Sequence, residues 1–119
     1  MTGKPLNKPL ISIITVVYNA GDLLKDTIES IVQQDYIHIE YLIIDGYSTD
    51  NTIDVIKSYN DQISKWISEP DEGIYDAMNK GIRMATGDYI LFINAGDKLH
   101  SRGILTQIFS QLNNRPQVI

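Results

Sequence analysis

Residues 10–17 read Leu-Ile-Ser-Ile-Ile-Thr-Val-Val, an almost unbroken run of apolar and β-branched side chains. A run of this length and composition is typical of a parallel strand that is buried on both faces. Residues 40–45 (Glu-Tyr-Leu-Ile-Ile-Asp) have the same character and predict a second buried strand. Shorter runs at 65–68 and 88–93 predict a third and a fourth strand, with Pro70 ending the third.

Helical periodicity separates these strands. Apolar side chains three or four positions apart predict a first helix over about 22–34, a second after the capping residues 48–50, a third that ends at Gly87 and a last one after Ser101. The apolar stripes expected to face the core are, helix by helix, Leu23, Leu24, Ile28, Ile31 and Val32; Ile53, Ile56 and Tyr59; Tyr75, Met78, Ile82 and Ala85; and Ile104, Leu105, Ile108 and Leu112.

The alternation of strands and helices predicts the α/β class, with a doubly wound, mostly parallel sheet and helices on both faces. We expect the strand order 3-2-1-4, because right-handed crossovers from a central first strand then cover both faces of the sheet. Loops that follow parallel strands emerge at one edge, which is where ligands bind in such sheets.

Composition excludes several classes of protein. The chain has 119 residues, of which 43% are hydrophobic and 21% charged, as expected for one globular domain or part of one. No apolar segment approaches the roughly 20 residues of a membrane span. Fifteen acidic and ten basic residues give a net charge of −5, which argues against a nucleic-acid partner. The absence of cysteine excludes disulfides and thiolate metal sites and is compatible with a cytoplasmic location.

Polar residues follow all four predicted strands, at 18–19, 45–48, 69–73 and 94–97. Such residues are also ordinary turn formers, but four loops that converge on one edge favour a ligand site. Several carboxylates without neighbouring cysteine or histidine suit a divalent cation, Mg²⁺ or Mn²⁺, bound together with substrate phosphates. Neither the glycine signature of a phosphate-binding P-loop nor that of a dinucleotide fold is present.

Residues 11–99 resemble the donor-binding half of family 2 glycosyltransferases, which have the GT-A fold. The matching stretches are 13–19, 43–52, 68–82 and 85–97. The resemblance implies that Val16 and Tyr18 line the pocket for the base, that Asp45 opens the turn used against base and ribose, that Asp76 faces the same cleft, and that Asp97 binds the metal. The nucleotide-sugar residues implied in this way are Val16, Tyr18, Asn19, Asp45, Gly46, Ser48, Asp76 and Asn94.

The sequence departs from the family pattern in two places. The family often has two adjacent acids after the second strand, whereas this chain has Asp45 and Gly46. Base recognition is therefore expected to depend on Asp45 or on backbone groups. In the metal motif, Asn94 and Gly96 stand where the family often has acids, which leaves Asp97 as its one carboxylate.

The function implied by the resemblance is inverting transfer of a sugar from a nucleotide-diphosphate sugar, with a UDP-sugar favoured, to a hydroxyl of a saccharide or lipid-linked acceptor. The expected setting is cell-surface polysaccharide or glycolipid biosynthesis, in the cytoplasm or at the inner face of the membrane. The general base is expected beyond Ile119, so residues 10–119 are interpreted as a truncated domain after a tail at 1–9. An open edge of the fourth strand predicts homo-oligomers.

Two other functional classes compete with this interpretation. One is a nucleotide-binding module without catalysis. The other is a phosphoacceptor receiver, which needs paired acids after the first strand, where this chain has Tyr18 and Asn19. Among isolated residues, His100 is expected to be solvated rather than a ligand, Lys80 to extend along the surface, and Trp66 to lie in the core.

Overall fold

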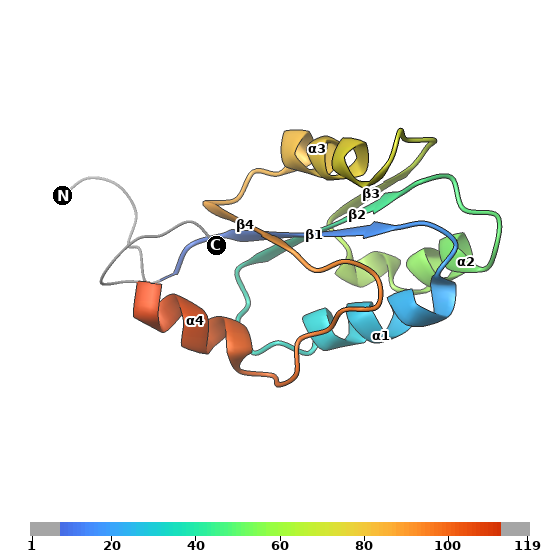
Figure 1. Cartoon of the computed structure of the whole chain (residues 1–119). Coiled ribbons are helices and arrows are strands. Elements are labelled where there is room, and N and C mark those ends of the chain that lie inside the picture. The colour runs from blue at the N-terminus through green and yellow to red at the C-terminus, as the bar shows by residue number, and fades with distance from the viewer. Residues whose placement is uncertain (1–7, 113–119) are drawn as a thin grey trace.

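The computed structural model describes residues 8–112, which form a four-stranded parallel sheet with helices on both faces (Figure 1). The strands are β1 (Ile11–Val17), β2 (Ile39–Asp45), β3 (Lys65–Ser68) and β4 (Tyr89–Phe92). The helices are α1 (Gly21–Val32), α2 (Thr52–Ser58), the 3-10 turn η1 (Asn60–Gln62), α3 (Ile74–Met84) and α4 (Ile104–Leu112). The strand order β3-β2-β1-β4 confirms the predicted order 3-2-1-4.

β1 is the centre of the sheet, and every one of its residues is buried. It pairs with β2 along its whole length, from Ile11 beside Ile39 to Val17 beside Asp45. On its other side it pairs with β4 only as far as Ile14. Helix α3 covers one face of the sheet and α1, α2 and α4 cover the other (Figure 1), which explains why the β1 sequence lacks polar alternation.

Successive residues of the central strands point to opposite faces and build two separate cores. In β1, Ile11 and Ile13 join the larger core, which contains side chains of α1, α2 and α4. Ile14 and Val16 join the smaller core, which contains Ala77 of α3.

The faces predicted for two helices are correct only in part, since Leu24, Ile28 and Ile31 of α1 are buried as predicted but other members of the stripes are exposed. In α1, Leu23 is 55% exposed, and the buried face includes Thr27. In α3, Tyr75 is 78% exposed, and the buried positions are Ala77 and Gly81. Small residues are needed there because a Cβ at position 81 would lie 2.6 Å from Ile14 Cγ2.

The last helix also begins later than predicted. α4 starts at Ile104 rather than directly after Ser101, whose backbone carbonyl accepts a hydrogen bond from Gln34 Nε2 instead. Leu105 of the predicted stripe is buried, and it is joined by Phe109, which the stripe did not include. The side chain of Leu112 and most of the predicted tail at 1–9 lie outside the described residues.

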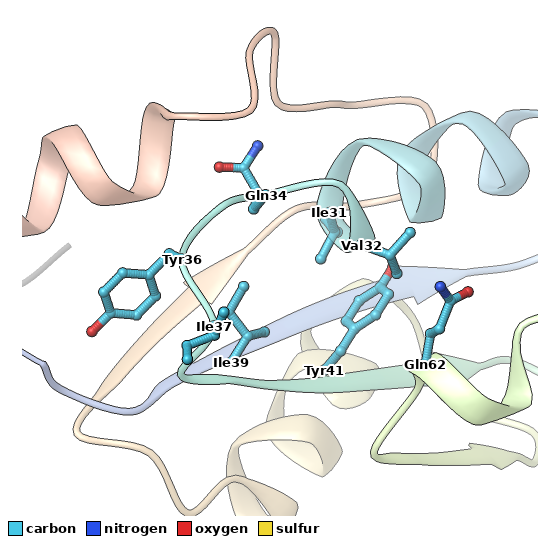
Figure 2. Close-up of a pocket in the computed structure, with 8 residues that line it drawn as sticks. All are labelled: Ile31, Val32, Gln34, Tyr36, Ile37, Ile39, Tyr41 and Gln62. Atoms are coloured by element: carbon cyan, nitrogen blue, oxygen red, sulfur yellow. The ribbon is translucent and has the colours of Figure 1, made fainter.

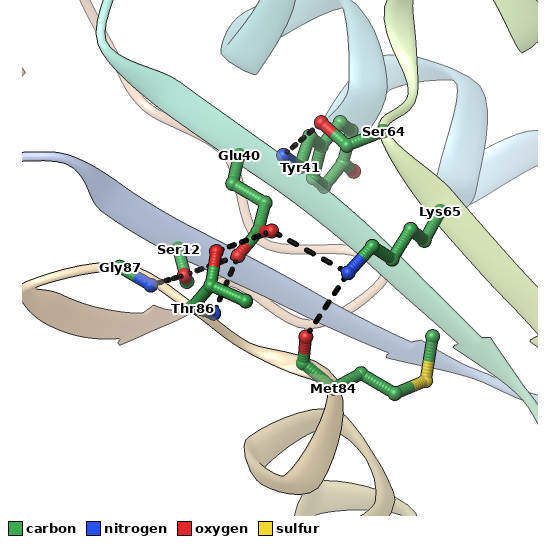
Figure 3. A network of polar contacts seen from close by, with 8 residues as sticks. All are labelled: Ser12, Glu40, Tyr41, Ser64, Lys65, Met84, Thr86 and Gly87. Atoms are coloured by element: carbon green, nitrogen blue, oxygen red, sulfur yellow. Dashed lines mark hydrogen bonds and ion pairs between the residues drawn. The ribbon is translucent and has the colours of Figure 1, made fainter.

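A polar network holds the turn between α3 and β4 against the sheet (Figure 3). Its centre is Glu40 on β2, whose side chain is 11% exposed. Glu40 accepts hydrogen bonds from Ser12 Oγ at 2.7 Å and from the backbone N–H of Thr86 at 2.8 Å, and Lys65 Nζ lies 3.8 Å away. Ser12 Oγ in turn accepts from the N–H of Gly87 at 2.8 Å, so one carboxylate links β1, β2, β3 and this turn.

Candidate functional site

The loops after the parallel strands leave the sheet at its carboxyl edge, and those after β1, β2 and β3 lie together at one end of the molecule in Figure 1. Strand order reverses at β1, which has β2 on one side and β4 on the other. A parallel α/β sheet forms its ligand crevice at such a position.

Asp45, the last residue of β2, is completely buried. Its Oδ2 atom accepts hydrogen bonds from the N–H groups of Tyr47 (3.1 Å) and Ser48 (2.9 Å) and from Ser68 Oγ (2.7 Å), and its Oδ1 atom accepts from Ser48 Oγ (2.5 Å). Two carboxylate oxygens offer about four lone-pair sites, so these four hydrogen bonds use most of the acceptor capacity of the Asp45 side chain. Asp45 therefore organises the loop from within rather than facing solvent.

Asn19 and Ser48 join the loops that follow β1 and β2. The N–H of Asn19 donates to Ser48 Oγ at 2.8 Å, and Asn19 Oδ1 accepts from the N–H of Thr49 at 2.8 Å. Asn19 has a φ of 47° and Tyr47 a φ of 73°. Left-handed backbone is uncommon away from glycine. At Asn19 it is held by the contacts between the two loops, and at Tyr47 by the hydrogen bond from its N–H to Asp45.

A hollow of about 290 Å³ opens beside these loops, between the end of β1 and the start of α3. Tyr18, which is 63% exposed, lies on its rim. The residues that line it are Val16, Val17, Tyr18, Asp71, Gly73, Ile74 and Ala77. The hollow thus brings together the predicted site residues Val16 and Tyr18, whereas Asp71 was not among the predicted site residues.

Gly46 lies next to both Tyr18 and Asp71, two residues that line the hollow. A Cβ atom placed on Gly46 would lie 2.8 Å from Asp71 Oδ2 and 3.4 Å from Tyr18 Cδ1. In the sequence, only its place in the polar loop after β3 pointed to Asp71 as a candidate site residue. The contact with Gly46 joins residues 25 positions apart and is visible only in the fold.

The loop after β4 is fastened to both β1 and α1. The N–H of Val16 donates to Asn94 Oδ1 at 3.4 Å. The buried hydroxyl of Thr27 donates to the backbone carbonyl of Asp97 at 2.6 Å and accepts from the N–H of Gly96 at 3.0 Å. The side chain of Asp97 is exposed, and within residues 8–112 nothing hydrogen-bonds to its carboxylate.

Asp76 and Lys80 fasten the loop after β3 to α3. Lys80 Nζ donates to the carbonyl of Pro70 at 2.8 Å and lies 3.3 Å from Glu69 and 3.7 Å from Asp76. Asp76 also accepts from the N–H of Glu72 at 2.9 Å. Lys80 was expected to extend along the surface, but its side chain is only 13% exposed, because three loop and helix oxygens surround its ammonium group.

Metal binding would fall to Asp97. Over the part of the chain that the structure describes, no cluster of three or more histidine or acidic side chains could hold a metal ion by itself. One free carboxylate suits a cation that takes its other ligands from substrate phosphates and water. His100 is exposed and lines a different polar hollow of about 300 Å³ with Asp26, Glu29 and Lys98 among others.

A third hollow, also of about 290 Å³, lies at the opposite end of the sheet (Figure 2). It is formed by the end of α1, the start of β2 and η1, and it is lined by Ile31, Val32, Gln34, Tyr36, Ile37, Ile39, Tyr41 and Gln62. All eight residues are uncharged. A diphosphate would find neither a cation nor a metal-binding carboxylate there, so the carboxyl edge is the better candidate site.

Sequence comparison identifies the family of this chain. The sequence model of glycosyl transferase family 2 matches residues 12–119. The chain belongs to glycosyl transferase family 2. This family 2 chain is 35% identical over 111 residues to the uncharacterized glycosyltransferase Rv1514c of Mycobacterium tuberculosis, covering 92% of the chain and 42% of the relative.

A second relative is the putative teichuronic acid biosynthesis glycosyltransferase TuaG of Bacillus subtilis. It is 38% identical over 94 residues, which cover 76% of this chain and 37% of TuaG. The family 2 chain thus spans less than half the length of either relative.

Solved structures share the fold. The mannosyltransferase PcManGT of Pyrobaculum calidifontis, in complex with GDP-Man and Mn²⁺, matches with a TM-score of 0.81 and 24% identity over 88% of this chain and 32% of PcManGT. TarS 1-349 of S. aureus, in complex with UDP-GlcNAc, matches with a TM-score of 0.80 and 20% identity over 88% of this chain and 31% of TarS. The fold of this family 2 chain is GT-A, as the resemblance implied.

Proposed function

We propose that this chain is the donor-binding part of a glycosyltransferase that uses a nucleotide-diphosphate sugar. The donor site would comprise the predicted residues Val16, Tyr18, Asn19, Asp45, Gly46, Ser48, Asp76 and Asn94 together with Asp71. In this proposal the base lies in the hollow beside Tyr18 and Gly46. Asp45 and Ser48 act through the loop that they hold, and Asp76 acts through the loop after β3.

One observation carries the proposal. The side chain of Val16 lines the hollow, and its backbone N–H donates to Asn94 Oδ1 at 3.4 Å. Asn94 begins the tight turn in which the N–H of Asp97 donates to the carbonyl of Asn94 at 2.9 Å. The hollow and an unengaged carboxylate are therefore connected through two hydrogen bonds, which supports binding of a nucleotide diphosphate together with a cation.

Asp97 would hold a divalent cation, Mg²⁺ or Mn²⁺, with the donor diphosphate completing its ligands. When bound, such a cation supplies charge neutralisation to a departing diphosphate. PcManGT has Mn²⁺ in its complex with GDP-Man, which supports the choice of cation. Thr27 would position the loop of the cation site, because its hydroxyl donates a hydrogen bond to the carbonyl of Asp97 and accepts one from the N–H of Gly96.

The acceptor and the general base are proposed to lie outside these 119 residues. Support comes from the relatives, of which this chain covers 42% and 37%. The names of relatives, teichuronic acid biosynthesis for TuaG and PGL/p-HBAD biosynthesis for mycobacterial proteins, favour a saccharide or lipid-linked acceptor in cell-surface polysaccharide or glycolipid synthesis. The proposed location is the cytoplasm or the inner face of the membrane. Within residues 8–112, no helix is long and apolar enough to cross a bilayer.

Calorimetric titration tests the donor site. UDP is expected to bind more tightly than ATP, and Mg²⁺ or Mn²⁺ is expected to strengthen UDP binding. Asp97→Ala should abolish the effect of the cation, whereas Asp61→Ala, which removes an exposed carboxylate on η1, should leave it unchanged. Cation-dependent binding that survives in Asp97→Ala would remove Asp97 from its proposed role, and failure of the wild-type chain to bind any nucleotide would overturn the proposal.

Self-association through β4 is a second proposal. β4 is an edge strand of the described sheet, and its four residues, Tyr89–Phe92, are apolar and only half-buried. An unpaired apolar edge is a template for pairing with another chain. Light scattering over a concentration series should show more than a monomer, and a monomer at high concentration would contradict the proposal.

A further inference from the structure

The carboxylate of Asp45 is not free to bind a nucleotide base. Its side chain is fully buried, and it already accepts four hydrogen bonds from Tyr47, Ser48 and Ser68. A base in the hollow could reach it only by breaking this network. The second acid that often follows in the family is absent, because position 46 is glycine.

Asp71 occupies the space that a side chain at position 46 would take. A Cβ atom on Gly46 would lie 2.8 Å from Asp71 Oδ2, closer than real Cβ contacts allow. The left-handed glycines of the described chain are Gly73 and Gly96, so a positive φ does not explain the glycine at position 46. A side chain at position 46 would therefore displace the Asp71 carboxylate from its present position.

The Asp71 carboxylate is also held in place. Its Oδ1 atom accepts a hydrogen bond from the N–H of Gly73 at 3.1 Å. Lys80 fixes the preceding residue through the carbonyl of Pro70 at 2.8 Å. This leaves Oδ2 beside Gly46 and the Tyr18 ring, on the wall of the hollow.

We infer that Asp71 is the residue that selects the base, by accepting a hydrogen bond from a ring N–H group. This inference rests on the proposed donor site. Uracil and guanine carry such a ring N–H, whereas cytosine and adenine present a lone pair at the corresponding ring nitrogen, which a carboxylate repels. A site built to accept from an N–H group discriminates strongly against a ligand that lacks it. The donor is thereby narrowed to a uridine or guanosine diphosphate sugar.

The test is calorimetric titration of the chain with UDP, GDP, CDP and ADP in the presence of Mg²⁺. UDP or GDP should bind at least roughly tenfold more tightly than CDP and ADP, since hydrogen bonds to charged groups are worth that much. Asp71→Asn should reduce this preference to within about threefold, because an amide presents a donor or an acceptor with equal ease. Glu72→Gln is the matched control, since it removes an exposed carboxylate from the same loop, and it should keep the preference.

A second test moves the carboxylate from position 71 to position 46 in a double variant. Gly46→Asp alone should weaken UDP or GDP binding, because the new side chain collides with Asp71. Adding Asp71→Gly should restore binding and the preference for UDP or GDP over CDP. An unchanged preference in Asp71→Asn would overturn the inference while leaving the donor site intact. A wild-type chain that binds none of the four nucleotides would overturn the proposed function, and this inference with it.

Discussion

Ser68, the last residue of β3, donates a hydrogen bond of 2.7 Å to the buried carboxylate of Asp45, the last residue of β2. The two residues are also paired in the register of the sheet. The point at which both strands end is therefore fixed by a side chain as well as by the backbone. The loops that follow β2 and β3 both start from this pair, and the loop after β3 lines the hollow.

Asp45→Ala is expected to lower the free energy of unfolding by about 3 kcal/mol or more. The substitution leaves two backbone N–H groups and the hydroxyls of Ser48 and Ser68 without their acceptor in a partly buried place, and hydrogen bonds to charged groups contribute about 1.5–3 kcal/mol each. Urea denaturation measures the loss. Asp61→Ala, at an exposed position, should stay within about 0.5 kcal/mol of wild type. An equally small effect of Asp45→Ala would mean that the loop after β2 keeps its structure without the Asp45 carboxylate.

Glu40 makes the free energy of unfolding depend on pH in the acid range. Burial raises its pKa, but hydrogen bonds from Ser12 and Thr86 and the charge of Lys65 outweigh burial and hold the pKa below the ordinary value of 4.5. A carboxyl whose pKa is lowered on folding stabilises fully above its unfolded pKa and loses that contribution as the pH falls through the folded value. Wild type should therefore lose stability below about pH 4.5 more steeply than Glu40→Gln.

Thermal unfolding at pH 7 and at pH 4 measures this difference. Glu40→Gln should be less stable than wild type at pH 7, and the gap should narrow in acid. Glu72→Gln, which removes an exposed carboxylate, should follow the wild-type curve at both values. A gap that is equally wide at both pH values would contradict the assignment of this acid dependence to Glu40.

The strands were predictable because their signals are local, and their order followed from right-handed crossovers about a central first strand. The runs at 10–17 and 40–45 have no polar alternation, and the sheet does bury both strands on both faces. The stripe on α3 was predicted wrongly at Tyr75 and Ile82, which are exposed. Their hydrophobicity predicted contact with the sheet, but the helix packs on the sheet through the small residues Ala77 and Gly81. Periodicity identifies a helix but does not distinguish a large apolar residue on the surface from a small one in the core.

Candidate site residues at the strand ends could be named from the sequence, and their partners could not. The family resemblance implied Val16 and Tyr18, and both line the hollow in the structure. Asp71 depends on a close approach to Gly46 that no spacing in the sequence encodes. Lys80 is mostly buried only because its three oxygen partners assemble around it in the fold.

Gly81→Ala is expected to destabilise the fold although alanine favours helices. Alanine in mid-helix gains about 1 kcal/mol over glycine. Against this, the new Cβ would lie 2.6 Å from Ile14 Cγ2, and overpacking costs about 1–3 kcal/mol. Urea denaturation should show a net loss of up to about 2 kcal/mol. Ile14→Ala in the same chain should cost less than the sum of the two single changes, because it removes the atoms that collide.

Lys80→Met should weaken nucleotide binding as well as stability, because Lys80 positions the loop that carries Asp71. The change removes the hydrogen bond to the carbonyl of Pro70 and the ion pairs with Glu69 and Asp76 while retaining a long apolar side chain. A loss of about 1–2 kcal/mol in the free energy of unfolding is expected, with a several-fold rise in the Kd for UDP.

The matched control for Lys80→Met is Lys25→Met, an exposed position on α1, which should change neither stability nor affinity measurably. Lys80→Arg keeps the positive charge and should recover part of the affinity. The decisive comparison is the preference for UDP over CDP at a temperature where every variant is folded. Since Lys80 acts on Asp71 through the loop, Lys80→Met should narrow that preference. Loss of stability with an unchanged preference would show that Lys80 supports the fold alone.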